Sequence, residues 1–362
     1  MDCVLSGIKF QRPFASYLWL LCLVLIADYN QASELSLADR KLLKIIDLEK
    51  AFFAIDPNPS SDAKELNRKA QDIVSLYEAF ISENPDDTNA LILYGKFLNK
   101  VGQENHAIGF FLKADEINPK IAVVKQQIGN FLVENNKPID ALPFFTATVE
   151  INPSIPEYHF HLGNFLHLFE EEISGSGILE GKTIESFAHE CFGQAAQKKP
   201  NSFEYRLRFA QSFFDLSNAN YYLALKEWDK LKNDFEGLLS KPEIDYIKLC
   251  KARVLLELNQ KVEATSLIDE VSTKSLVKSK KVLLDSIKNK SKNNTQKVKS
   301  NDLKKTGYLK ILTNDPHIAR LKQVTKRLRE ENLIKQLDAD QIQVRHDADG
   351  NPRLIVNQNL YE

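Results

Sequence analysis

The sequence predicts an all-α protein in which antiparallel helix pairs stack into an extended array. Prolines recur at one constant interval, at Pro85, Pro119 and Pro153. Glycines keep the same interval, at Gly95, Gly129 and Gly163. In two stretches within residues 34–84 apolar residues recur every three or four places, which is the spacing of amphipathic helices. A constant interval of this length is typical of a repeat array rather than of a single globular core.

Each unit places the same kinds of residue after its glycine. In the first unit these are Ala107, Phe111 and Ala114, and in the second they are Ala141, Phe145 and Thr148. The third unit closes 13 residues late, so we expect an insertion near residues 171–184; its closing residues are Ala188, Phe192, Ala195 and Pro200. Two divergent units follow, marked by Ala210, Ala224, Trp228, Ala252, Ala264 and Ile268.

These residues and spacings resemble the tetratricopeptide repeat (TPR) family over about residues 60–272. The resemblance implies a TPR-like α-solenoid, in which helix pairs form a superhelix with a concave, partner-binding face. The residue chemistry fits this packing. Small residues allow two helices to approach closely, the aromatic rings fill the space toward the next unit, and each proline falls just after a helix.

The chain divides into five predicted segments. A signal peptide or signal anchor occupies 1–32, and an N-terminal helical cap occupies 34–84. The TPR array of about five units follows at 85–272, and a Lys-rich linker follows at 273–305. The last segment, 306–362, predicts a helix that begins near Pro316 and a β-hairpin around DADGNP. We expect this appendage to dock on the last repeat or on a partner.

The first segment has the pattern of an export signal. Lys9 and Arg12 precede an apolar run from Phe14 to Ala27, FASYLWLLCLVLIA, and a polar stretch follows it. This run is shorter than the roughly 20 residues that span a bilayer as a helix. A cleaved signal, an uncleaved anchor and a buried soluble helix all remain open. We expect the protein to be exported (periplasmic or secreted), or membrane-anchored with its repeats outside the cytoplasm.

Composition and motifs argue against an enzyme. The chain carries 48 basic and 49 acidic residues, so its global charge does not favour nucleic acid. Gly181, Lys182 and Thr183 match only the end of a phosphate-binding loop. The spacing of His159, His161 and His167 does not put two imidazoles on one helix face. We therefore expect no catalytic residues, no metal site and no cofactor, and we expect Cys191 and Cys250 to be buried thiols.

The candidate binding site is the concave face that the resemblance implies. In the TPR family, exposed residues of each first helix line the groove, and an Asn directly after the Gly often contacts the partner's backbone. This gives nine groove residues in this chain: Lys96, Gln126, Asn130, Phe160, Asn164, His167, Arg208, Gln211 and Arg253. We expect a non-enzymatic scaffold or adaptor that binds a protein or peptide of unknown identity.

An alternative function comes from the lysines of the predicted linker. Residues 274–305 hold eleven lysines against two aspartates. Such a segment favours either a flexible linker or an arm that binds nucleic acid or an anionic surface. No aromatic residue interleaves with these lysines, which disfavours base stacking.

Overall fold

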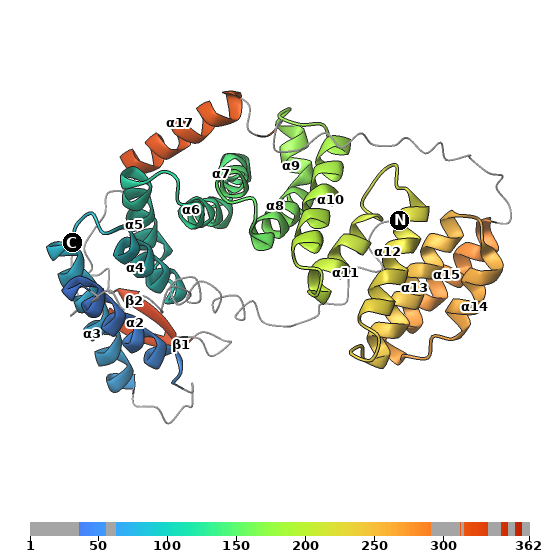
Figure 1. Cartoon of the computed structure of the whole chain (residues 1–362), viewed down its shortest axis with the longest axis horizontal. Coiled ribbons are helices and arrows are strands. Elements are labelled where there is room, and N and C mark those ends of the chain that lie inside the picture. The colour runs from blue at the N-terminus through green and yellow to red at the C-terminus, as the bar shows by residue number, and fades with distance from the viewer. Residues whose placement is uncertain are drawn as a thin grey trace. The chain divides into compact units, whose positions relative to one another are not determined.

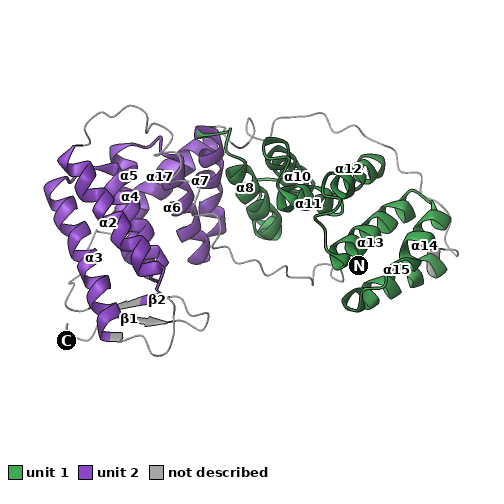
Figure 2. Ribbon diagram, turned by 60° about the horizontal axis from the view of Figure 1, so that its bottom comes forward, with its two compact units in different colours: residues 1–12, 152–311 green, residues 13–151, 312–362 purple. Residues whose placement is uncertain are grey.

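The structure is a computed structural model of the 362-residue chain, and it describes residues 36–55, 63–290, 312, 315–331, 342–346 and 352–356. The chain forms two compact units (Figure 2). Among the described residues, unit 1 holds 152–290, and unit 2 holds 36–55, 63–151, 312, 315–331, 342–346 and 352–356. The predicted export segment, 1–32, lies outside the described residues. Among the helices that are described, none is long and apolar enough to cross a membrane.

Unit 2 begins with two helices and continues with two helix pairs (Figure 1). The first two are α2 (Leu37–Phe53) and α3 (Ala63–Glu83), which lie within the predicted N-terminal cap. The pairs are α4 (Thr88–Lys100) with α5 (Glu104–Ile117), and α6 (Ala122–Glu134) with α7 (Pro138–Ile151). Polar caps start two of these helices. The backbone N–H of Asp39 donates to Ser36 Oγ at 3.0 Å in α2, and Asp87 accepts from the backbone N–H of Ala90 at 3.0 Å in α4.

Unit 1 contains further helix pairs with more variation (Figure 1). Its first pair is α8 (Pro156–Leu168) and α10 (Gly181–Lys198), separated by the short α9 (Glu170–Gly175). The next pairs are α11 (Phe203–Ser212) with α12 (Tyr221–Asp234), and α13 (Lys241–Glu257) with α14 (Lys261–Asp269). The predicted insertion therefore contains α9 and a turn. Gly181, Lys182 and Thr183 form the first turn of α10, with α9 rather than a strand before them.

Each repeat proline lies just after a helix, as the constant interval predicts. The second helix of each pair ends two residues before a proline: α3 at Glu83, α5 at Ile117, α7 at Ile151 and α10 at Lys198. A proline there interrupts no intrahelical hydrogen bond, because it is already outside the helix. The prediction that each proline falls just after a helix is confirmed.

Three turns within pairs share a backbone motif that the repeat pattern did not predict. Gly102, Asn136 and Asn259 have positive φ, at 81°, 55° and 66°. In each turn the next backbone N–H donates five residues back at 2.8 Å: Gln103 to Leu98, Lys137 to Leu132 and Gln260 to Leu255. This is the Schellman ending, which satisfies a helix carbonyl and reverses the chain.

The packing of each pair depends on its glycine. A Cβ on Gly95 would lie 2.8 Å from Cε1 of Phe111, and one on Gly163 would lie 2.9 Å from Cε1 of Phe192. The same distance at Gly129, to Phe145, is 3.0 Å. Real Cβ contacts are almost never as short as those at Gly95 and Gly163 and are rarely as short as that at Gly129, so in each pair the aromatic ring occupies the space that a side chain would need. The predicted close approach of the two helices is confirmed at all three glycines.

The predicted linker is wrong in its first half. Residues 274–290 form η2 (Lys274–Leu276) and α15 (Val277–Lys290), which pack against α13 and α14. Leu276 and Leu283 are buried, and Ile287 is half-buried on the same helix face. This apolar stripe explains the order, because it adds a final layer to the repeat stack. Residues 291–305 of the predicted linker lie outside the described residues.

The C-terminal segment packs on unit 2. Helix α17 (Asp315–Glu331) contacts α5 and α7, and therefore does not dock on the last repeat (Figure 1). Strands β1 (Ile342–His346) and β2 (Pro352–Val356) pair antiparallel, with Val344 opposite Leu354, and they contact α3 and α4. The predicted turn at 347–351 lies outside the described residues.

Candidate functional site

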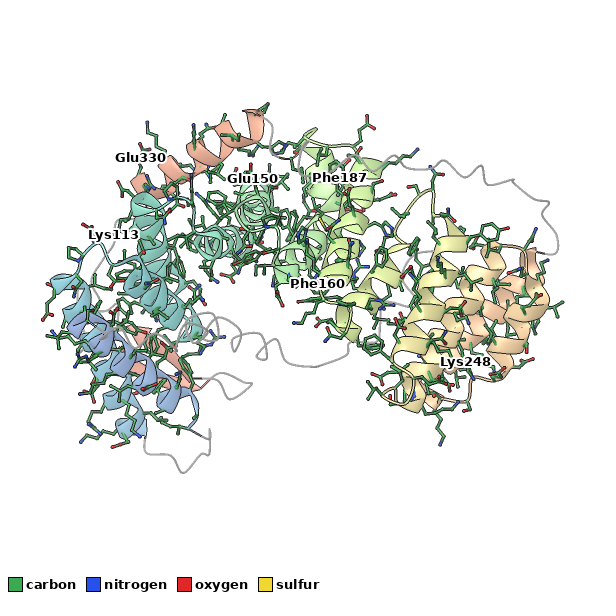
Figure 3. All side chains as sticks on the ribbon, viewed as in Figure 1. Lys113, Glu150, Phe160, Phe187, Lys248 and Glu330 are labelled. Atoms are coloured by element: carbon green, nitrogen blue, oxygen red, sulfur yellow. The ribbon has the colours of Figure 1, made fainter. Side chains whose placement is uncertain are left out.

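The predicted groove residues of unit 1 lie on the first helices α8, α11 and α13. On α8, Phe160, Asn164 and His167 are spaced by four and three residues, so they share one side of the helix. Phe160 (labelled in Figure 3) packs its ring 4.7 Å from the ring of Tyr205 on α11. This contact joins two successive first helices through aromatic side chains.

An acidic residue outside the predicted groove set contacts two groove residues. Asp215, just after α11, accepts a hydrogen bond from Arg208 Nη1 at 2.9 Å. Its Oδ2 also lies 3.7 Å from Nδ1 of His167 on α8. Arg208 places its guanidinium 4.0 Å from the centre of the Phe192 ring, a cation–π arrangement. The cationic group is therefore oriented by both a carboxylate and an aromatic face.

A buried histidine supports this region from α10. His189 Nδ1 lies 2.7 Å from Ser212 Oγ, and that hydroxyl donates to the Phe209 carbonyl at 2.7 Å. Ser212 therefore accepts the hydrogen bond, and Nδ1 of His189 carries a proton. Burial lowers the pKa of His189 to about 4, so the imidazole is neutral at pH 7. Burial also lowers the pKa of His167, although Asp215 acts in the opposite direction.

The remaining groove residues of unit 1 contact neighbouring repeats, Gln211 the following one and Arg253 the preceding one. Gln211 Nε2 donates to the hydroxyl of Tyr246 on α13 at 2.8 Å. Arg253 places its guanidinium 4.1 Å from the centre of the Phe214 ring. These side chains are half-buried, so each combines a contact within the array with partial exposure to solvent.

In unit 2 the predicted groove residues differ in how much of each side chain is exposed. Lys96 and Asn130 are half-buried, one on α4 and one on α6. Gln126 was predicted to be a surface residue of α6, but only 7% of it is exposed. Helix α6 packs against both α5 and α7, which explains why little of its surface remains open. Gln126 is therefore withdrawn from the candidate site.

Two asparagines stand out among the predicted residues. Asn130 and Asn164 each follow the packing glycine of their repeat, and each is half-buried. Within the described residues, neither amide has a hydrogen-bond partner. An amide offers both a donor and an acceptor, which is what the backbone of an extended peptide requires. These two side chains are the most available polar groups of the candidate site.

The histidines on α8 have structural partners. His159 Nε2 donates to the backbone carbonyl of Pro153 at 2.8 Å, and burial lowers the pKa of His159. Burial likewise lowers the pKa of His161. No group of three His, Cys, Asp or Glu side chains with the geometry of a metal site occurs in the described part of the chain. Cys191 and Cys250 are buried and unpaired as predicted, and burial raises the pKa of Cys250 to about 12.

Comparison with known proteins gives similarity only at the level of structure. No protein-family model matches the chain, and the search of curated proteins gives no match. The chain is similar to YrrB, described as a TPR protein with an unusual peptide-binding site, at 16% identity and a TM-score of 0.44, over 60% of this chain and 97% of YrrB.

Two further structures give comparable values. PilW, a type IV pilus biogenesis factor, has 12% identity and a TM-score of 0.42, over 69% of this chain and 99% of PilW. The protein PilF of Pseudomonas aeruginosa has 15% identity and a TM-score of 0.42, over 71% of this chain and 99% of PilF.

The repeat itself identifies the architecture. The ends of α3, α5 and α7, at Glu83, Ile117 and Ile151, keep one constant interval, and the turns at Gly102 and Asn136 keep the same one. The glycine–phenylalanine contact recurs in three successive pairs. The chain is a TPR-like helical-repeat protein.

Proposed function

We propose that this protein is a non-enzymatic scaffold or adaptor that binds a protein or peptide through the first helices of its repeats. The observation that carries the proposal recurs in each unit, at Asn130 in unit 2 and at Asn164 in unit 1. Both are partly exposed, both follow the packing glycine, and neither amide has a partner within the described residues. In unit 1, Phe160 and Arg208 add an apolar and a cationic group on the first helices.

A peptide selected from a displayed library against the full chain provides a defined probe. Asn130→Ala and Asn164→Ala, made singly, show which unit the peptide binds, and the change in that unit should weaken binding by about 0.5–1.5 kcal/mol, the net value of one hydrogen bond. The double variant should lose at least as much, which is roughly 2- to 13-fold in affinity. Stability should change by less than about 0.5 kcal/mol, because both positions are polar and partly exposed.

The matched control is Glu150→Ala, an exposed position on the second helix α7. This change should leave the affinity for the peptide unaltered. If both asparagine variants bind as tightly as the wild type, the first helices are not the binding surface and the proposal fails.

We further propose that the repeats act outside the cytoplasm, either released or held at a membrane by the N-terminal segment. The support is the basic start and the apolar run of residues 14–27. A reporter fused after residue 40 should appear outside the cytoplasm or in the membrane fraction. Mass spectrometry of the mature N-terminus distinguishes cleavage from anchoring, and a soluble cytoplasmic fusion that retains Met1 rules out export.

A second candidate function is binding of an anionic surface through α15. Lys278, Lys281 and Lys288 share one face of this helix, and all three are exposed. Changing the three lysines to Gln should abolish sedimentation with vesicles that contain phosphatidylserine, if this candidate is correct. Wild-type protein that stays in the supernatant at low salt excludes it.

A further inference from the structure

The surface of α5 and α7 carries a second helix in the structure. Helix α17 packs across α7 and α5, far in sequence from both (Figure 3, where Glu330 marks α17, Glu150 marks α7 and Lys113 marks α5). We propose that this α5–α7 site binds an arginine-bearing amphipathic helix of a partner protein, and that α17 is the intramolecular occupant with which the partner competes. This site is separate from the groove residues on the first helices.

Electrostatic complementarity defines one half of the site. Asp140, in the first turn of α7, accepts hydrogen bonds from Arg320 at 3.1 Å and from Arg327 at 2.5 Å. Within the described residues these arginines are its only basic contacts. Burial favours the neutral carboxyl, but the hydrogen bonds from Arg327 and Arg320 outweigh it and lower the pKa of Asp140. When α17 leaves, Asp140 loses both partners.

A second carboxylate lies at the other end of the site. Asp115 on α5 is buried, and its Oδ1 lies 2.6 Å from Nζ of Lys125 on α6. Its Oδ2 lies 3.6 Å from Nη2 of Arg329 on α17. Because Lys125 belongs to the repeats, Asp115 keeps a counter-charge without α17. Asp140 is therefore the group whose ion pairing depends most on the occupant.

The apolar contacts give the site its helical specificity. Val324 and Leu328 are buried one turn apart, and His317 is buried two turns before Val324. The opposite side of α17 is exposed at Lys322, Lys326 and Glu330. A ligand for this site therefore needs arginines seven residues apart, beside an apolar pair such as Val324 and Leu328.

The connectivity makes the occupant displaceable. The helices of unit 2 from α2 to α7 follow one another along the chain, and α17 belongs to none of their pairs. Releasing α17 leaves the Schellman turns at Gly102 and Asn136 and the glycine contacts of α4 and α6 intact. An external helix can replace α17 without unfolding a repeat.

The test uses a labelled synthetic peptide of residues 312–331 as the probe for the full chain. In the wild type α17 occupies the site, whereas Arg320→Glu with Arg327→Glu removes its ion pairs. The peptide should therefore bind this double variant at least roughly tenfold tighter than the wild type. Adding Asp140→Asn to the double variant should reverse the gain, again by roughly tenfold or more. Lys322→Glu with Lys326→Glu is the matched control, and it should bind the peptide as weakly as the wild type.

Equal peptide affinity for the wild type and the double variant overturns the proposal. So does an affinity of the double variant that Asp140→Asn leaves unchanged. A second measurement covers the case in which the double variant folds poorly. Excess peptide added to isotope-labelled wild-type chain should accelerate hydrogen exchange in residues 315–331 of the chain itself, while exchange in α4 and α6 stays constant. Unchanged exchange in α17 at saturating peptide contradicts displacement.

Discussion

The first helix pair of unit 1 closes its turn differently from the pairs α4–α5 and α6–α7 of unit 2 but packs in the same way. In unit 2, Gly102 and Asn136 reverse the chain with positive φ. In unit 1 the pair α8–α10 is joined instead by α9 and a further loop. Nevertheless Gly163 meets Phe192 as closely as Gly95 meets Phe111. The contact between the helices, rather than the turn that joins them, therefore fixes how they pack.

The pair α11–α12 shows how far this contact can diverge. Ala210 occupies the position of the glycine, and Trp228 occupies that of the phenylalanine. Both are completely buried in one apolar cluster of unit 1. The connection between these two helices is also two residues longer than in the regular pairs. Substitutions show whether the pair with Ala210 and Trp228 depends on its contact as strongly as the glycine–phenylalanine pairs do.

The largest expected effect concerns the divergent pair. Trp228→Ala should lower the free energy of unfolding of unit 1 by about 3–5 kcal/mol, because it removes a fully buried indole and leaves a cavity. Urea titration followed by circular dichroism measures this loss. Tyr222→Ala, on the same helix but 73% exposed, is the control and should change stability by less than about 0.5 kcal/mol. A loss below about 1 kcal/mol for Trp228→Ala would show that the pair does not depend on its aromatic residue.

The next largest effect is a dependence of the stability of unit 1 on pH. His189 has a pKa of about 4 when folded, below its ordinary value of 6.5. Between these two pH values the unfolded chain therefore binds more protons than the folded chain. The contribution of His189 to the free energy of unfolding is complete above pH 6.5 and is lost as the pH falls toward 4. The expected loss is about 3 kcal/mol.

The fluorescence of Trp228 reports this loss during urea unfolding at pH 7.0 and at successively lower pH, in a Trp19→Phe background. His189→Gln keeps a donor for Ser212 but cannot be protonated in this range. The variant should therefore lose less stability than the wild type between pH 6.5 and 4. Equal losses in the two chains would mean that His189 is not the group responsible.

A smaller effect concerns the close contact of unit 2. Gly95→Ala places a Cβ 2.8 Å from Phe111, and overpacking costs about 1–3 kcal/mol. Alanine regains about 1 kcal/mol of helix propensity, so the net loss should lie between zero and about 2 kcal/mol. Adding Phe111→Leu should make Gly95→Ala less costly, which a double-mutant cycle measures. Gly175→Ala, where no atom lies within 4 Å of the new Cβ, should not destabilise the chain.

The smallest effect concerns the turns themselves. Asn136→Gly should change stability by less than about 1 kcal/mol, because relief of the positive φ is offset by the greater entropy of glycine in the unfolded chain. Asn136→Ala should destabilise unit 2 by about 1 kcal/mol, since alanine gains no local hydrogen bond in this conformation. Thermal unfolding of both variants provides the comparison. If Asn136→Ala proves more stable than Asn136→Gly, the turn does not constrain the pair.

The sequence was sufficient for the repeat and insufficient for the long-range polar contacts. The constant interval placed Gly95, Phe111 and Pro119 correctly because their roles repeat along the chain. The pairing of Asp140 with Arg327 spans 187 residues and follows no period, so no pattern predicts it. One signal was available, since α7 is apolar from Ala141 to Phe145 and is buried without a break from Ala141 to Thr146. Such a helix must be covered on more than one side.

The candidate site shows a similar division. The position of Asn164 beside Gly163 follows directly from the repeat. The partners of its neighbours, Asp215 for Arg208 and Tyr246 for Gln211, come from outside the repeated positions. The linker prediction was based on the many lysines of α15 and overlooked the helical spacing of Leu276, Leu283 and Ile287. A helix was therefore predicted to be a linker.

The central claim is that partners bind the first helices of the repeats, and hydrogen–deuterium exchange of the full chain tests it most directly. The library-selected peptide should slow exchange in the first helices of the unit that it binds, in α8 and α11 around Asn164 and Arg208 or in α6 around Asn130. Exchange in α12 and α14 should stay unchanged, because these second helices lie outside the proposed surface. Protection confined to second helices, with α6, α8 and α11 unaffected at saturating peptide, would contradict the account.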